Sequence, residues 1–380
     1  MSMNKQKRIM IIAGESSGDQ HAARYVREHE KLNPDIIFDA FGQKELKNTT
    51  ANFIYDTEKI AVVGIMEVIS KYKEITDALK LAKSHINKTK PDLIILVDYV
   101  EFNLKIAKFA KGLGINVIFY IAPQLWAWRE RRAHNLVKNI DHLAVIFPFE
   151  EIFFQKYTDN VTYVGHPLFE NTHLLSSVRK YEDRNTDLGI FPGSRESEIK
   201  NNIYSMLDCI QKNKNEKIKI FYANKTSLDL LKKLLPPEFH SKLESGKDIA
   251  EVSSCKKALC ASGTVTLELA ILEIPMVVMY KLSYVTFFIM RSLVKLNYIG
   301  LVNLMLGDKI GQEPIVKEYI QPSYSDQIDI MVELNKIDND QLHRNNMLDK
   351  FREIKDKLSI ESEKKLWMIA EDLILSLIHI

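Results

Sequence analysis

Short apolar runs alternate with longer amphipathic segments from the start of the chain. In the first half the apolar runs lie at 8–13, 35–41, 92–98, 115–121, 142–147 and 161–165. The amphipathic segments lie at 66–89, 103–112, 129–139 and 149–157. Runs of Ile, Val and Leu that alternate with helical patterns predict a parallel sheet covered by helices on both faces.

The same alternation resumes after a polar stretch that has no period. We interpret 171–187 as a linker, and further apolar runs follow at 188–192, 217–222, 248–252, 257–261 and 276–280. Helical patterns separate them at 196–212, 226–234 and 264–272. The expected fold is α/β, with two doubly wound Rossmann-like domains, 1–170 and 188–345, facing a cleft. The charged segment 346–380 is expected to form helices that cross back to the first domain.

The composition excludes several classes of protein. With 380 residues, 46% of them hydrophobic and 27% charged, the chain is typical of a folded protein of more than one domain. A formal net charge of +2 does not indicate a nucleic-acid-binding surface. The three cysteines form no C-x-x-C pair, which favours a reducing compartment. Because no apolar stretch reaches the roughly 18 residues of a membrane-spanning helix, we expect a soluble or peripheral protein.

The first apolar run leads directly into AGESSGD, at 13–19, and then into a helical pattern. A dinucleotide-binding protein carries its glycine-rich turn at this place. Here Gly14 and Gly18 are spaced as G-x-x-x-G, which is not the dinucleotide pattern G-x-G-x-x-G. We therefore do not interpret this loop as a nucleotide site.

Asp98 ends the apolar run 92–98, and Glu101 follows three residues later. Open parallel sheets bind ligands at the carboxyl ends of their strands, where partial burial raises the basicity of a carboxylate. Both residues are therefore candidates for acid–base chemistry. From its position alone, Asp98 is explained equally well as the cap of the helix that starts near residue 102.

A turn suited to phosphate opens the second domain. The sequence PGSR, at 192–195, stands between an apolar run and a helical pattern. Gly193 permits close backbone approach, and Ser194 and Arg195 place a hydroxyl and a fixed cation beside a helix N-terminus. An ordinary strand–helix turn with a surface arginine would look the same.

A second turn of this kind follows the run 257–261. It reads Ser262-Gly263-Thr264, and Glu268 lies one helical turn after Thr264. Amides and hydroxyls suit phosphate, and a carboxylate one turn later suits ribose hydroxyls. Helix capping also explains Ser and Thr here, but two such turns in one domain are more informative than either alone.

Two segments combine bulky apolar side chains with basic ones, which is typical of an interfacial helix. They contain Trp126, Trp128 and Arg129 in the first segment and Phe287, Phe288 and Arg291 in the second. The second segment is explained more simply as core.

No metal site is expected. The ten histidines show no ligand spacing such as H-x-x-x-H. Asp338-Asn339-Asp340 has the D-x-D form of metal-dependent sugar transferases. Because it follows ELNKI rather than a buried strand, we interpret it as a solvated turn.

Taken in their order, these segments resemble those of the lipid-A-disaccharide synthase family, glycosyltransferases of the GT-B type. The resemblance covers nearly the whole chain. It rests on AGESSGD (13–19), GIMEV (64–68), DYVEFN (98–103), LWAWRERR (125–132), FPFE (147–150), VGHP (164–167), PGSR (192–195), ASGTVTLE (261–268), PMVVMYK (275–281), VNLMLG (302–307) and PIVKEYIQ (314–321). The family's D-x-P-D-F-N appears here without its proline and with Glu101 in place of the second Asp. The S-P-S pattern before WAW reads APQ at 122–124, and the basic residue common after N-L-x-x-G is missing.

The resemblance implies transfer of 2,3-diacylglucosamine from its UDP derivative to 2,3-diacylglucosamine 1-phosphate. The products would be a β-1,6-linked disaccharide 1-phosphate and UDP, and no cofactor or metal is implied. The chain would act in the cytoplasm of a Gram-negative bacterium, in peripheral contact with the anionic inner-membrane surface through the aromatic–basic segments. No nucleic-acid partner is expected, and a monomer and a homodimer both remain open.

The resemblance also implies roles for individual residues. Asp98 would be the general base for the acceptor 6-hydroxyl, with Glu101 as the alternative, and Arg195 would stabilise the departing UDP. Glu268 would contact the ribose, and His166 would either face the donor or fix a hinge. Further substrate contacts are expected from Glu15, Ser16, Ser17, Asn103, Ser194, Ser262, Gly263, Thr264, Asn303 and Gln321.

Other functions make different predictions. Another UDP-GlcNAc-using GT-B enzyme, such as a peptidoglycan N-acetylglucosaminyltransferase or a UDP-GlcNAc epimerase, would use a non-acylated donor. A nicotinamide-dependent oxidoreductase would carry G-x-G-x-x-G, which is missing. A non-catalytic lipid-carrying protein would leave the two phosphate-type turns unexplained.

Overall fold

The computed structural model describes residues 6–60, 70–128, 130–210, 217–281, 298, 300–306, 314–359 and 362–375. Contacts between residues divide the chain into two compact units. Unit 1 contains Met1–Pro167 and Ile360–Ile380, and unit 2 contains Leu168–Ser359. Each unit is built on its own parallel sheet.

Unit 1 has a seven-stranded sheet in the order β3-β2-β1-β4-β5-β6-β7, and all of its strand pairs are parallel. The strands are β1 (Arg8–Ala13), β2 (Ile37–Gly42), β3 (Asn52–Asp56), β4 (Leu93–Val97), β5 (Asn116–Tyr120), β6 (His142–Val145) and β7 (Val161–Tyr163). The central strand β4 reads LIILV, and all five residues are buried. A strand covered on both faces requires such a continuous apolar run.

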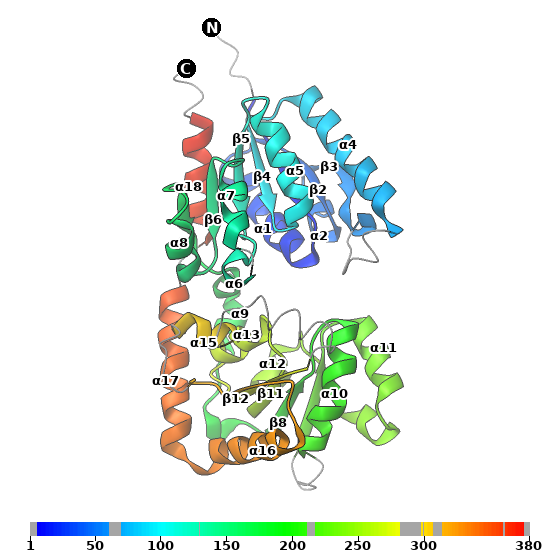
Figure 1. Ribbon diagram of the computed structural model, residues 1–380, viewed down its shortest axis with the longest axis vertical. Helices are drawn as coiled ribbons and strands as arrows, with labels where there is room; N and C mark the ends of the chain where they lie inside the picture. The colour runs from blue at the N-terminus through cyan, green and yellow to red at the C-terminus, as the bar shows by residue number, and fades with distance from the viewer. Residues whose placement is uncertain are drawn as a thin grey trace. The chain divides into compact units, whose positions relative to one another are not determined.

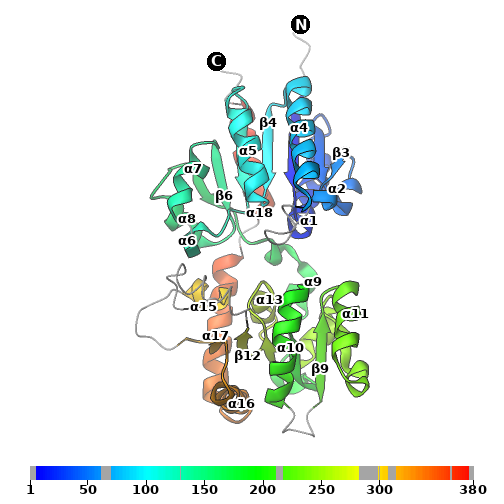
Figure 2. The same ribbon diagram turned by 45° about the vertical axis from the view of Figure 1, so that its right-hand side comes forward.

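Helices cover both faces of this sheet (Figures 1 and 2). They are α1 (Ser16–Leu32), α2 (Lys44–Lys47), α4 (Tyr72–Thr89), α5 (Val100–Lys111), α6 (Leu125–Trp128), α7 (Ala133–Val137), α8 (Pro148–Phe154) and α18 (Ser362–Leu375). Helices α4 and α5 pack against each other. Helices α1 and α18 share one core cluster with alternate residues of β1 and β4.

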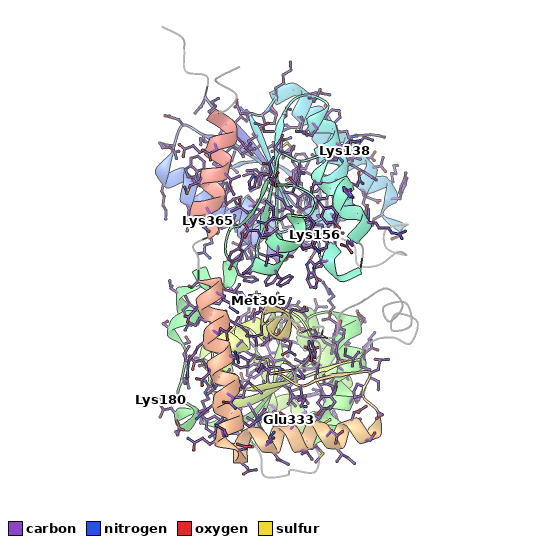
Figure 3. The ribbon with its side chains drawn as sticks, turned by 60° about the vertical axis from the view of Figure 1, so that its left-hand side comes forward. Lys138, Lys156, Lys180, Met305, Glu333 and Lys365 are labelled. Atoms are coloured by element: carbon purple, nitrogen blue, oxygen red, sulfur yellow. The ribbon has the colours of Figure 1, made fainter. Side chains whose placement is uncertain are left out.

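The C-terminal helix α18 therefore belongs to unit 1. Its residues Leu366, Ala370 and Ile374 are buried in the core formed with α1, β1 and β4. The ring of Trp367 lies 3.8 Å from that of His29 on α1. Lys365, which is labelled in Figure 3, donates from Nζ to the carbonyl oxygen of Tyr163 at 3.4 Å.

Unit 2 has a six-stranded sheet in the order β10-β9-β8-β11-β12-β13, again with parallel pairs throughout. The strands are β8 (Thr186–Phe191), β9 (Ile218–Tyr222), β10 (Leu243–Ser245), β11 (Cys255–Cys260), β12 (Met276–Tyr280) and β13 (Glu318–Ile320). Numbered from β8, this is the order 3-2-1-4-5-6 of a doubly wound fold. The first six strands of unit 1 follow the same order.

The helices of unit 2 are α9 (Thr172–Ser176), α10 (Glu196–Ile210), α11 (Lys225–Leu234), α12 (Ile249–Ser253), α13 (Val265–Ile271), α15 (Leu301–Leu306), α16 (Tyr324–Asn339) and α17 (Gln341–Leu358). Helices α13 and α17 pack together, as do α10 and α16. The two Rossmann-like units anticipated from the apolar pattern are therefore present.

Several elements differ from the expectation. The run 248–252, expected as a strand, is the helix α12, because the Asp248 side chain accepts the N–H of Glu251 and caps a helix. The pattern did not reveal β3, β10 and β13, and the last two are only three residues long. The segment 171–187 carries α9 and the start of β8, and it groups with unit 2.

Candidate functional site

In unit 1 the strand order reverses between β1 and β4, and open parallel sheets bind ligands at such a point. Ala13 and Val97, the last residues of these strands, are paired. The AGESSGD loop (13–19) and Asp98 therefore leave the sheet side by side. The fold brings together two motifs that are far apart in the sequence.

The turn after β4 has an unusual backbone. The dihedral φ is 46° at Asp98 and 41° at Tyr99, a left-handed conformation that is costly for residues with side chains. Asn103 holds this turn, since its Nδ2 donates to the carbonyl oxygens of Val97 at 3.2 Å and Asp98 at 2.9 Å. Asn103 is fully buried, so its side chain does not reach the surface.

The two glycines of the AGESSGD loop make room for this turn. A Cβ at Gly18 would lie 2.1 Å from Asp98 Oδ2, and a Cβ at Gly14 would lie 2.1 Å from Cγ of Tyr99. Either contact is far inside van der Waals distance. The G-x-x-x-G spacing is thus explained by the Asp98 carboxylate and the Tyr99 ring that occupy these two places.

The surroundings of Asp98 make it more basic than an ordinary aspartate. Burial raises its pKa well above the usual value, and the nearby Glu15 carboxylate raises it further. Backbone N–H groups of Gly14, Glu15 and Tyr99 oppose the rise. Its buried Oδ1 has no hydrogen-bond partner among the described residues.

The other polar residues of the AGESSGD loop divide into two groups. Glu15, Ser16 and Ser17 are exposed at the start of α1. Asp19 is buried and accepts the N–H groups of Gln43 at 2.6 Å and Glu45 at 2.7 Å. Only the first group can meet a ligand, because Asp19 ties the loop to α2.

Glu101 differs from Asp98 in its surroundings. Its side chain is 67% exposed, and its Oε1 lies 2.6 Å from Arg132 Nη1. Of the two carboxylates considered from the sequence, Asp98 is the buried one and Glu101 is exposed and paired with Arg132.

A cluster of aromatic and ionisable side chains lies at the ends of β5, β6 and β7. Glu150 is buried and accepts the indole N–H of Trp126 at 3.2 Å and the backbone N–H of Phe147 at 3.3 Å. Burial raises the pKa of Glu150 to about 8. We did not single out Glu150 from the sequence, although it lies in the FPFE motif.

His166 belongs to the same cluster, where its ring lies 5.0 Å from that of Phe147. It is buried, and burial together with the nearby His21 lowers its pKa to about 3. His166 is therefore neutral at physiological pH and carries no charge for a phosphate.

Arg129, Phe287, Phe288 and Arg291 lie outside the described residues, as does the side chain of Trp128. Of the six residues considered for acyl or membrane contact, only the Trp126 side chain is described.

In unit 2 the order reverses between β8 and β11. Phe191 pairs with Cys260, and the N–H of Ala261 donates to the carbonyl oxygen of Phe191 at 2.8 Å. The PGSR turn (192–195) and the SGT turn (262–264) therefore start side by side. The glycines at their centres have positive φ, 115° at Gly193 and 153° at Gly263.

The amides of the PGSR turn already have an acceptor. Glu198, on the first turn of α10, accepts the N–H of Ser194 at 3.1 Å and of Arg195 at 3.3 Å through Oε2. Its Oε1 lies 3.2 Å from Arg195 Nη1. Ser194 is exposed, and the Arg195 side chain is 60% exposed.

The SGT turn is open by comparison. A Cβ at Gly263 would meet no atom within 4 Å. Thr264 is exposed, while Ser262 and Glu268 are half-buried. Burial raises the pKa of the Glu268 carboxyl.

Asn303 and Gln321 have structural contacts. The Nδ2 of Asn303 donates to the carbonyl oxygen of Val316 at 2.8 Å and to Glu318 Oε1 at 2.6 Å. Its Oδ1 accepts the N–H of Val316, and the side chain is buried. Gln321 has φ of 56°, and its N–H donates to the carbonyl oxygen of Tyr280 at 2.9 Å. Asn303 thus joins α15 to the strand β13.

Comparison with known proteins identifies the family. The family model described as lipid-A-disaccharide synthetase matches residues 9–371. The chain belongs to this lipid-A-disaccharide synthetase family. A lipid-A-disaccharide synthase of Nitrosococcus oceani is 34% identical over 375 residues, 95% of each chain. One from Coxiella burnetii is 34% identical over 363 residues, 93% of this chain and 94% of the relative.

Solved structures support the GT-B fold of the family. A UDP-GlcNAc 2-epimerase from Neisseria meningitidis, bound to UDP-GlcNAc, covers 96% of this chain and 100% of its own, with a TM-score of 0.60. The sequence identity is 13%, so the likeness concerns the fold alone. Because this likeness concerns only the fold, it does not support the UDP-GlcNAc epimerase function that was considered from the sequence. Among the described residues of this family member, no helix is long and apolar enough to cross a membrane.

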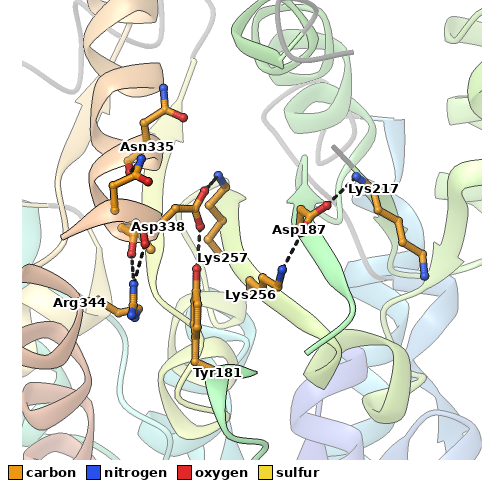
Figure 4. Close-up of polar contacts among 10 residues, drawn as sticks. Tyr181, Asp187, Lys217, Lys256, Lys257, Asn335, Asp338 and Arg344 are labelled. Carbon is orange, nitrogen blue, oxygen red and sulfur yellow. Dashed lines mark hydrogen bonds and ion pairs between the residues drawn. The ribbon is translucent and has the colours of Figure 1, made fainter. Parts of the chain in front are cut away.

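Among the residues that the structure describes, no group of three or more His, Cys, Asp or Glu side chains could hold a metal ion. The D-x-D stretch has another use. Asp338 pairs with the buried Nζ of Lys257 and accepts the Tyr181 hydroxyl at 2.7 Å (Figure 4). Asp340 caps α17. The interpretation of Asp338 as part of a solvated turn was wrong, since it anchors α16 to β11.

Proposed function

We propose that the chain transfers 2,3-diacylglucosamine from UDP to the 6-hydroxyl of 2,3-diacylglucosamine 1-phosphate. The products are the β-1,6-linked lipid A disaccharide 1-phosphate and UDP. The observation that carries this proposal is the family match over residues 9–371, which spans both units. The buried, basic carboxylate of Asp98 at the carboxyl edge of unit 1 supplies the chemistry that such a transfer requires.

Asp98 acts as the general base. The acceptor oxygen forms a bond to the anomeric carbon while its proton passes to Asp98, and the bond from that carbon to UDP breaks with its electron pair on the phosphate. The raised pKa and the absence of a hydrogen-bond partner for the buried Oδ1 among the described residues support this role. The ion pair between Glu101 and Arg132 argues against Glu101 as the base.

Unit 2 binds UDP. The exposed guanidinium of Arg195 stabilises charge on the leaving diphosphate, together with Ser194 and the open SGT turn, including Ser262, Gly263 and Thr264. Glu268, one turn along α13, contacts the ribose. Gln321 follows β13 and contributes to the sugar or phosphate contact, while Asn303 joins α15 to β13.

Unit 1 binds the acceptor. Glu15, Ser16 and Ser17 are exposed beside Asp98 and contact the sugar or its phosphate at the start of α1. Because His166 is buried and neutral, it fixes the path of the chain at the end of unit 1 instead of binding phosphate as a cation. Asn103 does not contact the acceptor itself but holds the backbone turn that positions Asp98.

Acyl chains and the membrane meet unit 1 near α6 and α8. Trp126 and Phe149 pack with ring centroids 4.9 Å apart, and Ile152 is 67% exposed. Exposed Lys138 and Lys156, labelled in Figure 3, supply positive charge on the same unit. We propose peripheral binding to the anionic cytoplasmic face of the inner membrane. The enzyme acts there as a monomer or homodimer.

A donor comparison tests the proposed function. UDP release is measured with the acylated acceptor and either UDP-2,3-diacylglucosamine or UDP-GlcNAc. We expect release only with the acylated donor, because the family substrate is acylated on both sugars. Turnover of UDP-GlcNAc without the acylated donor would contradict the proposal.

A further inference from the structure

The carboxylate of Glu198 lies where a donor phosphate would be expected. Its Oε2 accepts the backbone N–H groups of Ser194 and Arg195, and its Oε1 lies 3.2 Å from the Arg195 guanidinium. The Tyr280 hydroxyl lies 3.5 Å from the same oxygen. These are the contacts that an anionic oxygen would make with the PGSR turn.

The shape of the turn is fitted to this carboxylate. Gly193 has φ of 115°, and a Cβ there would lie 2.7 Å from Glu198 Cβ and 2.8 Å from Oε2. The Glu198 side chain is only 12% exposed. Burial and the Glu198 charge also raise the pKa of the Tyr280 hydroxyl. The negative charge is therefore held in a defined, mostly enclosed position.

Hydrogen bonds of Asn202 hold the backbone around this position. The buried Asn202, one turn beyond Glu198 on α10, donates from Nδ2 to the carbonyl oxygen of Pro192 at 3.1 Å. Its Oδ1 accepts the N–H of Lys281 at 2.7 Å. The turn is thus tied to the ends of both β8 and β12.

We propose that Glu198 is an internal stand-in for the donor diphosphate, and that UDP displaces it from the amides of Ser194 and Arg195. This inference rests on the proposed function, in which unit 2 binds UDP. When the diphosphate enters, Arg195 exchanges the Glu198 carboxylate for phosphate. Glu198 is then a residue that sets the affinity of the site, because every anion must compete with it.

Glu198 could also act only as a helix cap, and the test must distinguish this role from competition with the diphosphate. A Glu at the third position of a helix commonly caps its N-terminus. Capping alone predicts that removal of the charge destabilises α10 and weakens all ligands alike. Competition predicts that removal strengthens binding only of ligands that carry the diphosphate.

The experiment measures the affinity of the full chain for UDP and for uridine by calorimetry. Glu198→Gln removes the charge and keeps the size of the side chain. Glu196→Gln is the matched control, since Glu196 lies on the same turn, is 62% exposed and pairs with Lys200 instead. The melting temperature of each variant is recorded.

We expect Glu198→Gln to lower the Kd for UDP roughly tenfold, as expected for the loss of a competing charge-assisted contact. The Kd for uridine stays unchanged, and Glu196→Gln binds both ligands as the natural chain does. Unchanged or weaker UDP binding by Glu198→Gln overturns the inference while leaving UDP binding by unit 2 intact. No UDP binding by the natural chain would overturn the proposed function itself.

Discussion

Gly18→Ala is expected to displace Asp98, the proposed general base, without touching the proposed nucleotide site in unit 2. The added Cβ would lie 2.1 Å from Asp98 Oδ2, whereas ordinary contact begins at 3.4 Å. The carboxylate, or the loop that carries Gly18, must therefore move by the difference, 3.4 − 2.1 = 1.3 Å. A misplacement of about 1 Å at a reacting group costs about 100-fold in rate. We expect kcat to fall by roughly that factor, about 2.7 kcal/mol in the barrier.

The assay follows UDP release at saturating acylated substrates, with the Kd for UDP as the internal reference. UDP affinity should stay unchanged, because the proposed nucleotide contacts lie in unit 2. Gly112→Ala is the matched control in the same unit, since Gly112 has a right-handed helical backbone with φ of −63° and its nearest atom would be at 3.4 Å.

A double-mutant comparison shows whether Gly18 acts through Asp98. In an Asp98→Asn background, Gly18→Ala should cost little further rate, because the group that it displaces no longer accepts a proton. A Gly18→Ala enzyme with kcat within about threefold of the natural chain would refute the reasoning. So would full additivity of the two losses.

Three further changes follow from the same geometry. Asp98→Asn should abolish most turnover. In the natural enzyme, kcat/KM should fall on the acid side at a pH above the ordinary aspartate pKa, because burial raises the pKa of Asp98 and the base must be ionised to act. Arg195→Ala should lower kcat about 100-fold, because it removes the cation proposed to stabilise the leaving diphosphate. Lys200→Ala, at an exposed position on α10, should retain full rate. Burial raises the pKa of Glu150 from 4.5 to about 8, so between these pH values the folded state keeps the Glu150 proton while the unfolded state loses it. The free energy of unfolding should therefore fall as pH rises from 4.5 to 8, by at most about 5 kcal/mol. Urea unfolding at pH 5 and pH 9 should show this loss in the natural chain and a smaller one in Glu150→Gln.

The strand pattern was predictable because most of the sheet is buried on both faces. Runs such as LIILV in β4 cannot be placed on a surface, so their apolar continuity identifies them. The exception, 248–252, was short, and the capping side chain of Asp248 decided in favour of a helix. Short edge strands such as β10 and β13 have few buried positions and give no comparable signal.

The position of Asp98 at the end of a strand was predictable, but its surroundings were not. Asp98 follows an apolar strand, and that position is visible in the sequence. The facts that Gly14 and Gly18 make room for Asp98 and Tyr99 depend on the pairing of β1 with β4, which no local pattern specifies.

The sequence also did not distinguish residues that contact a ligand from residues that support the fold. Asn103 and Asn303 resemble substrate contacts in the sequence, yet both are buried and bonded to backbone carbonyls. Glu150 and Glu198 were not expected to matter from the sequence, because their burial and hydrogen bonds arise only when helices pack on the strand ends. A polar side chain in a family motif can serve either purpose.

Product analysis tests the central claim most directly. The purified chain is incubated with UDP-2,3-diacylglucosamine and 2,3-diacylglucosamine 1-phosphate, and the products are examined by mass spectrometry. The account predicts UDP together with a tetraacylated disaccharide 1-phosphate whose mass equals the two sugars joined with loss of UDP. Consumption of the donor without this disaccharide, or no reaction with the acylated pair, would contradict it.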